Sequence, residues 1–103
     1  MSFFLRHTHT LSTTTSIARG HIHNIKTWTF PAKPIPGGHV HRIRALTTFN
    51  RRHIHSFCRT TSPAIDVGNG MHIHYVKGLT NRVLAHRHRV RAFTSAAPNP
   101  PNE

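Results

Sequence analysis

All 12 histidines of this chain occur in pairs that are separated by a single residue. The imidazole nitrogens of histidine are ligands for zinc, copper and nickel. Residues i and i+2 of a β-strand project to the same side, so each pair can offer two ligands to one ion. The pairs therefore predict a repeated face with one common role. Its candidate metal ligands are His7, His9, His21, His23, His39, His41, His53, His55, His72, His74, His86 and His88.

Three roles are open for this face. A four-coordinate zinc site requires two pairs, or one pair with a third ligand and water, so opposed strands would build three four-histidine sites. Alternatively, histidine and threonine form a structural ladder in which each imidazole donates a hydrogen bond to a neighbour or to a backbone carbonyl. Direct contact between histidine and an anion is the third interpretation.

The pairs belong to a longer motif that recurs along the chain. His7 and His39 are 32 residues apart, and His39 and His72 are 33 apart, so the period spans two pairs. Counted from the first histidine, the fifth residue of each copy is apolar and the ninth is threonine. The apolar residues are Leu11, Ile25, Ile43, Phe57, Val76 and Val90, and the threonines are Thr15, Thr29, Thr47, Thr61, Thr80 and Thr94.

Offsets of two, four and eight residues fit the alternation of a strand and would scatter around a helix. We therefore predict an all-β protein of three tandem two-stranded units, at about 5–36, 37–69 and 70–96, in a single repeat domain over 1–96. Residues 97–103 form a Pro-rich tail. Short connectors within a unit favour hairpins, and the Pro- and Gly-rich connectors between units favour longer turns. The antiparallel sheet is open or closed and is expected to be completed by oligomerisation.

The charge balance is strongly basic, with 14 Lys and Arg residues against two acidic residues and a formal net charge of +12. Such a chain favours a polyanionic partner. Strand alternation places many cations on the face opposite the histidines, and further cations precede the fourth motif. The predicted polyanion-binding residues are Lys26, Arg42, Arg44, Arg51, Arg52, Lys77, Arg87, Arg89 and Arg91. Binding would be independent of sequence and dependent on salt, to either RNA or DNA.

Other classes of protein are disfavoured. Cys58 is the single cysteine, so the chain forms no internal disulfide and no thiolate metal site. No histidine has an acidic residue placed to orient it, so we predict no catalytic residues and no enzyme. No apolar run approaches the about 20 residues of a transmembrane helix.

Two segments carry a family resemblance, Gly37-Gly38-His39-Val40-His41 and Val67-Gly68-Asn69-Gly70 with the following His72-Ile73-His74. Over roughly Pro31 to Thr94 the chain resembles the YmaF family of small bacterial histidine-rich proteins. The resemblance implies a repeat β-protein with no assigned activity, and a Glu after the histidine pair in many members. The departures from that Glu favour a polyanion over an acid-assisted metal site; they are Arg42, Ser56, Tyr75 and Arg89.

Together these features predict a self-assembling structural β-repeat protein, a homo-oligomer or filament, whose basic strand face binds nucleic acid or another polyanion. The alternative is a metal-binding histidine-repeat module for zinc, copper or nickel. With no signal peptide or disulfide pattern evident, we expect a location in the bacterial cytoplasm or in a released assembly.

Overall fold

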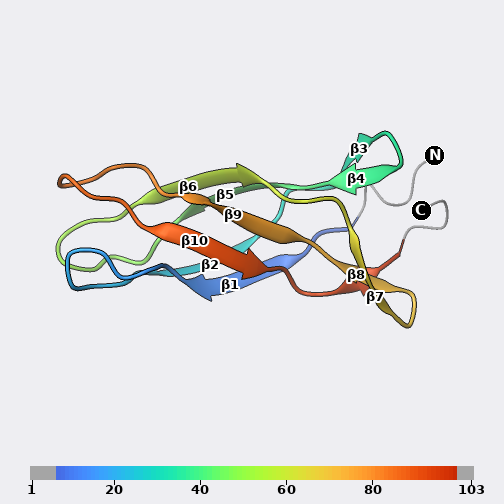
Figure 1. The fold of residues 1–103 in the computed structure, drawn as a ribbon, viewed down its shortest axis with the longest axis horizontal. Coiled ribbons are helices and arrows are strands. Elements are labelled where there is room, and N and C mark those ends of the chain that lie inside the picture. Colours follow the sequence, from blue (N-terminus) through green and yellow to red (C-terminus); the bar gives the residue numbers. More distant parts are fainter. Residues whose placement is uncertain (1–6, 100–103) are drawn as a thin grey trace.

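Secondary structure is entirely β in residues 7–99, the part of the chain that the computed structural model describes (Figure 1). The predicted all-β class is confirmed. No helix in this part of the chain has the length and apolar character needed to cross a membrane. Three antiparallel hairpins of five-residue strands form the body: β1 (Thr10–Thr14) with β2 (Asn24–Trp28), β5 (Arg42–Leu46) with β6 (Ser56–Thr60), and β9 (Tyr75–Leu79) with β10 (Arg89–Phe93).

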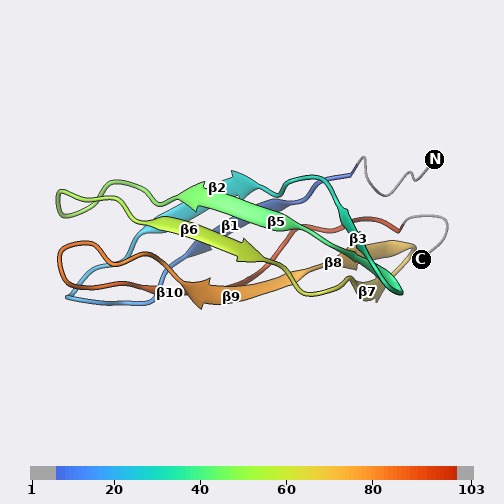
Figure 2. The same ribbon diagram turned by 90° about the horizontal axis from the view of Figure 1, so that it is seen from above.

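Backbone hydrogen bonds join each of these hairpins to the other two. Thr48 N donates to Asn24 O at 2.8 Å, Asn81 N to Ser56 O at 3.0 Å, and Ser16 N to Arg89 O at 2.8 Å. The three hairpins thus surround one long axis, and the structure as a whole extends over 45 × 23 × 18 Å (Figure 2). Within one chain, every hairpin already has a neighbour on both sides. Self-association, which we expected to complete the sheet, stays a prediction.

The core lies along the axis between the hairpins. It consists of the fifth residue of every motif, and each of these side chains is at most 1% exposed; they are Leu11, Ile25, Ile43, Phe57, Val76 and Val90. Strand alternation turns these residues inward and the flanking cations outward. A core of only six apolar side chains is thin for a domain of this length, and the buried polar residues around it are histidines and the motif threonines.

Two smaller sheets cover one end of the body (Figure 1). They contain β3 (Lys33–Ile35) with β4 (Gly38–Val40), and β7 (Ile65–Gly68), β8 (Met71–Ile73) and β11 (Ala97–Pro98). We expected longer turns in the two connectors between repeat units. These connectors instead form the short hairpins β3–β4 and β7–β8, whose turns contain Gly37 and Asn69 with positive φ. The described start of the predicted tail pairs with β8, and residues 100–103 lie outside the described part.

The opposite end of the body consists of three tight turns with two consecutive left-handed residues each. These are Arg19 and Gly20, Arg51 and Arg52, and Leu84 and Ala85, with φ between 50° and 77°. Two positive φ angles identify the turn geometry that best fits the twist of a hairpin, and it favours Asn-Gly. For a residue with a side chain, this conformation costs about 1–2 kcal/mol. All three turns therefore hold at least one strained residue, and two of them hold two.

Replacing the strained pair by the favoured one is expected to stabilise the protein. The double substitution Arg51→Asn with Arg52→Gly should raise the free energy of unfolding by about 1 kcal/mol, because it relieves left-handed strain at both positions. Chemical denaturation measures the change, and Leu84→Asn with Ala85→Gly is the matched variant in the equivalent turn. Destabilisation by both variants would contradict the explanation.

Candidate metal centres

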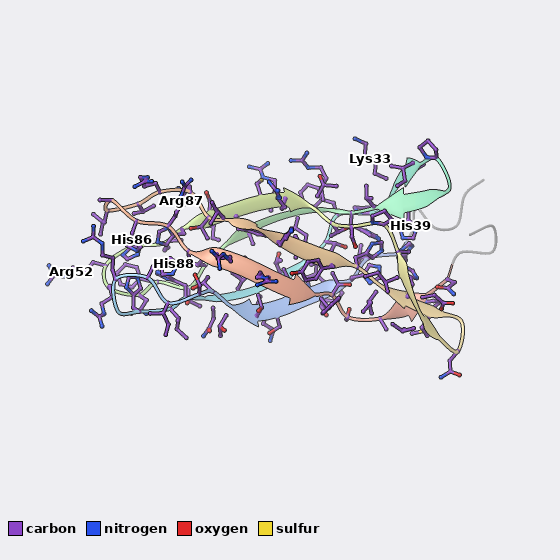
Figure 3. The ribbon with its side chains drawn as sticks, in the orientation of Figure 1. Lys33, His39, Arg52, His86, Arg87 and His88 are labelled. Carbon is purple, nitrogen blue, oxygen red and sulfur yellow. The ribbon has the colours of Figure 1, made fainter. Side chains whose placement is uncertain are left out.

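The hairpin register divides the histidine pairs into two groups. Every motif begins with its pair, and consecutive strands run in opposite directions, so the pairs alternate between the two ends of the core. Figure 3 shows His39 toward one end of the body and His86 and His88 toward the other. Cluster I consists of His7, His9, His39, His41, His72 and His74, and cluster II of His21, His23, His53, His55, His86 and His88. Within each cluster the candidate ligand atoms all lie within 4.8 Å of one another.

This grouping corrects the expectation of three four-histidine sites. That expectation assumed that two paired strands bring their histidines face to face. In an antiparallel hairpin the two pairs instead lie beyond opposite ends of the core. One pair from each of the three hairpins then meets at each end, and two six-histidine groups result.

The Nε2 atoms of each cluster converge on one point. In cluster I, His7 Nε2 lies 3.1 Å from His39 Nε2 and from His41 Nε2, and 3.2 Å from His72 Nε2. In cluster II the separations are 3.1–3.3 Å. Six nitrogens at about 2.2 Å from an octahedral ion, slightly more than the four-coordinate zinc distance, would lie about 3.1 Å from their neighbours and about 4.4 Å from the opposite ligand. The observed spacing matches this arrangement.

The packing of the rings follows the same polyhedron. Every imidazole meets four others of its cluster nearly edge-on, with centroids 4.5–5.1 Å apart and interplanar angles of 66–87°. In an octahedron each ligand has four neighbours and one opposite ligand. The remaining, opposite pairs are His7 and His74, His9 and His39, and His41 and His72 in cluster I, and His21 and His55, His23 and His86, and His53 and His88 in cluster II.

Each pair has an outer ring, which is the first histidine, and an inner ring, which is the second. Hydrogen bonds on Nδ1 fix which nitrogen of the inner rings carries the proton. The second histidine of every pair donates from Nδ1 to the backbone carbonyl that follows a motif threonine, at 2.7–2.9 Å; the acceptors for His9, His23, His41, His55, His74 and His88 are Ser95, Thr48, Phe30, Asn81, Ser62 and Ser16. A neutral imidazole that donates from Nδ1 has an unprotonated Nε2. The lone pairs of these rings therefore point into the cluster, and such carbonyl partners are typical of metal-binding histidines.

The outer rings of cluster II are held by the strained turns. Nδ1 of each first histidine lies 3.0–3.4 Å from the first left-handed residue's carbonyl; the pairs are His21 with Arg19, His53 with Arg51, and His86 with Leu84. The left-handed backbone thus aims a carbonyl at each ring. Strained conformations of this kind concentrate at functional sites. In cluster I, His72 Nδ1 lies 3.1 Å from Asn99 Oδ1, a partner that the repeat does not predict.

The motif threonine supports the inner rings from behind. Its Oγ1 accepts a hydrogen bond from the backbone N–H of a second histidine at 3.0–3.1 Å in all six motifs. In five motifs its hydroxyl also donates to the carbonyl that holds another imidazole, as Thr15 does to Ser16 O. The imidazole-to-carbonyl bonds of the ladder interpretation are present, and they leave Nε2 for a metal ion.

The surroundings keep the clusters neutral. Burial, with a smaller contribution from neighbouring histidines, lowers the pKa of His41 and of His74 to about 3, although a backbone hydrogen bond to each ring acts in the opposite direction. Burial also lowers the pKa of His9, His23 and His55. The Nε2 atoms of His9 and His88 are buried without a hydrogen-bond partner among the described residues. Neutral, unpartnered imidazole nitrogens are the form that binds a metal ion.

The predicted polyanion-binding residues are all exposed and form two groups. Arg42, Arg44, Lys77, Arg89 and Arg91 extend from β5, β9 and β10, and Lys26 extends from β2. Arg51, Arg52 and Arg87 lie near the tight turns instead, and Figure 3 shows Arg52 and Arg87 at that end.

Arg59 of β6 is an exposed cation that the sequence prediction missed. It occupies a motif position that strand alternation assigns to the histidine face, so the pattern placed it away from the other cations. Arg59 can extend outward because Gly78 on the neighbouring strand has no side chain, so this glycine is the sequence feature that could have indicated the exposure of Arg59.

Comparison with known proteins gives one match. No curated protein and no solved structure matches the chain. A family model, YmaF, which is described as spore germination protein GerY/YamF, matches residues 5–96. This match covers both clusters and all six motifs, well beyond the segments that first suggested the resemblance. The chain therefore belongs to the YmaF family.

Proposed function

We propose that this protein is a metal-binding module that holds one divalent transition-metal ion in each histidine cluster, with the six Nε2 atoms as ligands. The observation that carries the proposal is the octahedral placement of those nitrogens, at neighbour separations of 3.1–3.3 Å. The hydrogen bonds on Nδ1 supply the required tautomer in advance. Little reorganisation then opposes binding.

Geometry selects among the metals that suit imidazole. Zinc is almost always four-coordinate in structural protein sites, and Cu²⁺ prefers a tetragonal arrangement, so neither uses six equivalent nitrogens well. High-spin Ni²⁺ gains the most ligand-field energy from a regular octahedron, and Co²⁺ also accepts one. Of zinc, copper and nickel, nickel therefore fits the clusters best, even though copper binds more tightly to most nitrogen sites.

Six protein ligands also fill the coordination sphere. Catalytic metal sites keep a position open for water or substrate, whereas closed sites serve structure or storage. We therefore infer that these ions stabilise the fold or are stored by the protein. This agrees with the prediction that the protein is not an enzyme, which stays a prediction.

Metal analysis tests the proposal directly. Protein loaded with Ni²⁺ and then freed of excess metal is expected to contain two ions per chain, because the clusters are separate and equivalent in ligands. His41→Gln should remove the ion of cluster I, and His55→Gln that of cluster II, so each variant retains one ion. The Co²⁺ form should show the weak visible absorption of an octahedral ion.

Each variant is the control for the other, since both replace a buried second histidine with the same hydrogen-bond pattern. Loading with fewer than one ion per chain, or the intense absorption bands of tetrahedral Co²⁺, would contradict the proposal. Competition between equimolar Ni²⁺ and Zn²⁺ tests the preference for nickel.

Nucleic-acid binding and self-assembly remain predictions from the sequence. The exposed cations support the first of these.

A further inference from the structure

A basic groove lies on the outer surface where β6, β9 and β10 adjoin, away from the histidines. It has a volume of about 360 Å³ and is lined by Arg59, Lys77, Gly78, Leu79, Arg89 and Arg91. Four of these six residues are cations. The groove draws them from two hairpins, so the fold creates it and no single strand does.

Gly78 shapes the groove by making room for Arg59. A Cβ atom at Gly78 would lie 3.1 Å from Arg59 Cδ and 3.2 Å from both Arg59 Nε and Phe57 Cε1, which is tighter than ordinary contacts. Arg59 Nε donates to Lys77 O at 3.0 Å and so fixes the guanidinium across β9. The missing side chain thus lets an arginine of β6 extend over the neighbouring hairpin.

Among the described residues, the groove is lined by four cations and by no carboxylate. Lys77 pairs directly with Arg91 across β9 and β10, and like charges in opposed positions destabilise a sheet. The equivalent positions of the other hairpins pair a cation with a neutral residue, Lys26 with Ser12 and Arg44 with Cys58. Of the two acidic residues, Asp66 accepts a hydrogen bond from Gly68 N within β7, and Glu103 lies outside the described residues.

An apolar hollow of about 480 Å³ adjoins the same hairpin and is lined by Ser62, Pro63, Ala64, Ile65, Tyr75 and Phe93. Tyr75 and Phe93 face each other across β9 and β10 with ring centroids 4.9 Å apart. Arg91 lies between the basic groove and the apolar hollow. It lines the groove, and its Nε donates a hydrogen bond to Oη of Tyr75, a residue that lines the hollow, at 3.2 Å. Cations beside an exposed aromatic ring suit the two halves of a nucleotide.

We propose that this surface is a nucleotide site, in which the basic groove binds phosphate groups and the ring of Phe93 stacks on the base. The inference goes beyond metal binding and is independent of it. Phosphate oxygens neutralise the opposed Lys77 and Arg91, and arginine forks bind them in bidentate fashion. Phe93 is 59% exposed and so has a surface to offer a base. The phosphate can come from a free nucleotide or from a single strand.

Calorimetry with ADP and with pyrophosphate, at low salt and with the full chain as purified, tests the site. ADP is expected to bind at least about fivefold more tightly than pyrophosphate because its base stacks. Phe93→Ala should weaken ADP binding to the level of pyrophosphate. The double substitution Lys77→Gln with Arg91→Gln should weaken both ligands by at least about tenfold through lost charged hydrogen bonds.

Two further variants separate a built site from general attraction to a basic protein. Arg19→Gln with Lys33→Gln removes the same charge from exposed positions outside the groove and should change either affinity by less than about threefold. Gly78→Ala keeps every charge, displaces Arg59 and should weaken both ligands. Equal losses in the two double variants, or equal affinities for ADP and pyrophosphate, would overturn the proposal. A short oligothymidylate that binds while ADP does not would overturn a free nucleotide as the source. Thermal unfolding checks that each variant folds.

Discussion

Saturation with Ni²⁺ is expected to raise the midpoint of thermal unfolding by at least about 20 °C. An ion that binds only the folded chain adds about 2.7 kcal/mol when its free concentration is 100 times the dissociation constant, and there are two clusters. For a domain of this size, each kcal/mol moves the midpoint by about 4–8 °C. Differential scanning calorimetry with and without metal measures the shift.

The metal-induced shift is expected to be large because the metal-free clusters contain repulsive contacts that a bound ion removes. In cluster II both rings of each close pair donate from Nδ1 to a carbonyl, so their unprotonated Nε2 atoms face each other at 3.1–3.3 Å. Facing lone pairs without protons repel each other, and a cation at the centre replaces that repulsion with six bonds. The six-residue apolar core alone is small, so the clusters hold a large share of the buried volume.

The single-cluster variants supply the comparison. His41→Gln and His55→Gln should each show about half of the metal-induced shift, and the double variant should show almost none. Histidine pairs in the unfolded chain also bind Ni²⁺ weakly, which reduces the shift without removing it. A double variant that responds to metal as strongly as the original protein would show that the clusters are not the binding sites.

The sequence alone predicted most of the motif's structure. Offsets from each histidine identified the core residues, such as Leu11 and Phe57, and placed His9 and Thr15 on the buried side, because strand alternation is a local property. The same alternation predicted exposed cations at Arg42 and Arg89.

The number of ligands per site could not be predicted from the motif. It depends on how the hairpins close around the axis, and that closure uses hydrogen bonds between residues far apart in sequence, such as Ser16 N to Arg89 O. The same applies to Asn99, which contacts His72 from a segment we described as a tail. Arg59 was missed because its direction depends on a glycine of another hairpin.

The two proposed sites share one electrostatic constraint. Each bound dication would add two charges to a chain whose formal net charge is already +12. Neutral imidazole ligands carry no negative charge, so the added charge is not offset within the clusters. A phosphate ligand on the outer face would lower the repulsion that metal binding creates. Metal and nucleotide should therefore favour each other's binding modestly, although neither site needs the other.

Metal-free protein is expected to unfold cooperatively on mild acidification, beginning near pH 6.5. Burial holds the pKa of His41 and His74 at about 3, whereas the unfolded residues titrate near the ordinary value of 6.5. Above pH 6.5 both states are neutral. As the pH falls from there toward 3, the unfolded chain binds protons that the folded chain refuses, and each excess proton lowers the free energy of unfolding by about 1.4 kcal/mol per pH unit.

This acid transition can be assigned to histidine because the chain has almost nothing else that titrates there. Only Asp66 and Glu103 are acidic, so the protonation of carboxylates, the usual cause of acid unfolding, has little to contribute. Circular dichroism between pH 8 and pH 3 follows the transition, and bound Ni²⁺ should move its midpoint to lower pH because the ion competes with protons for Nε2. Full stability of the metal-free protein at pH 4 would show that the buried imidazoles accept protons in the folded state, contrary to their lowered pKa.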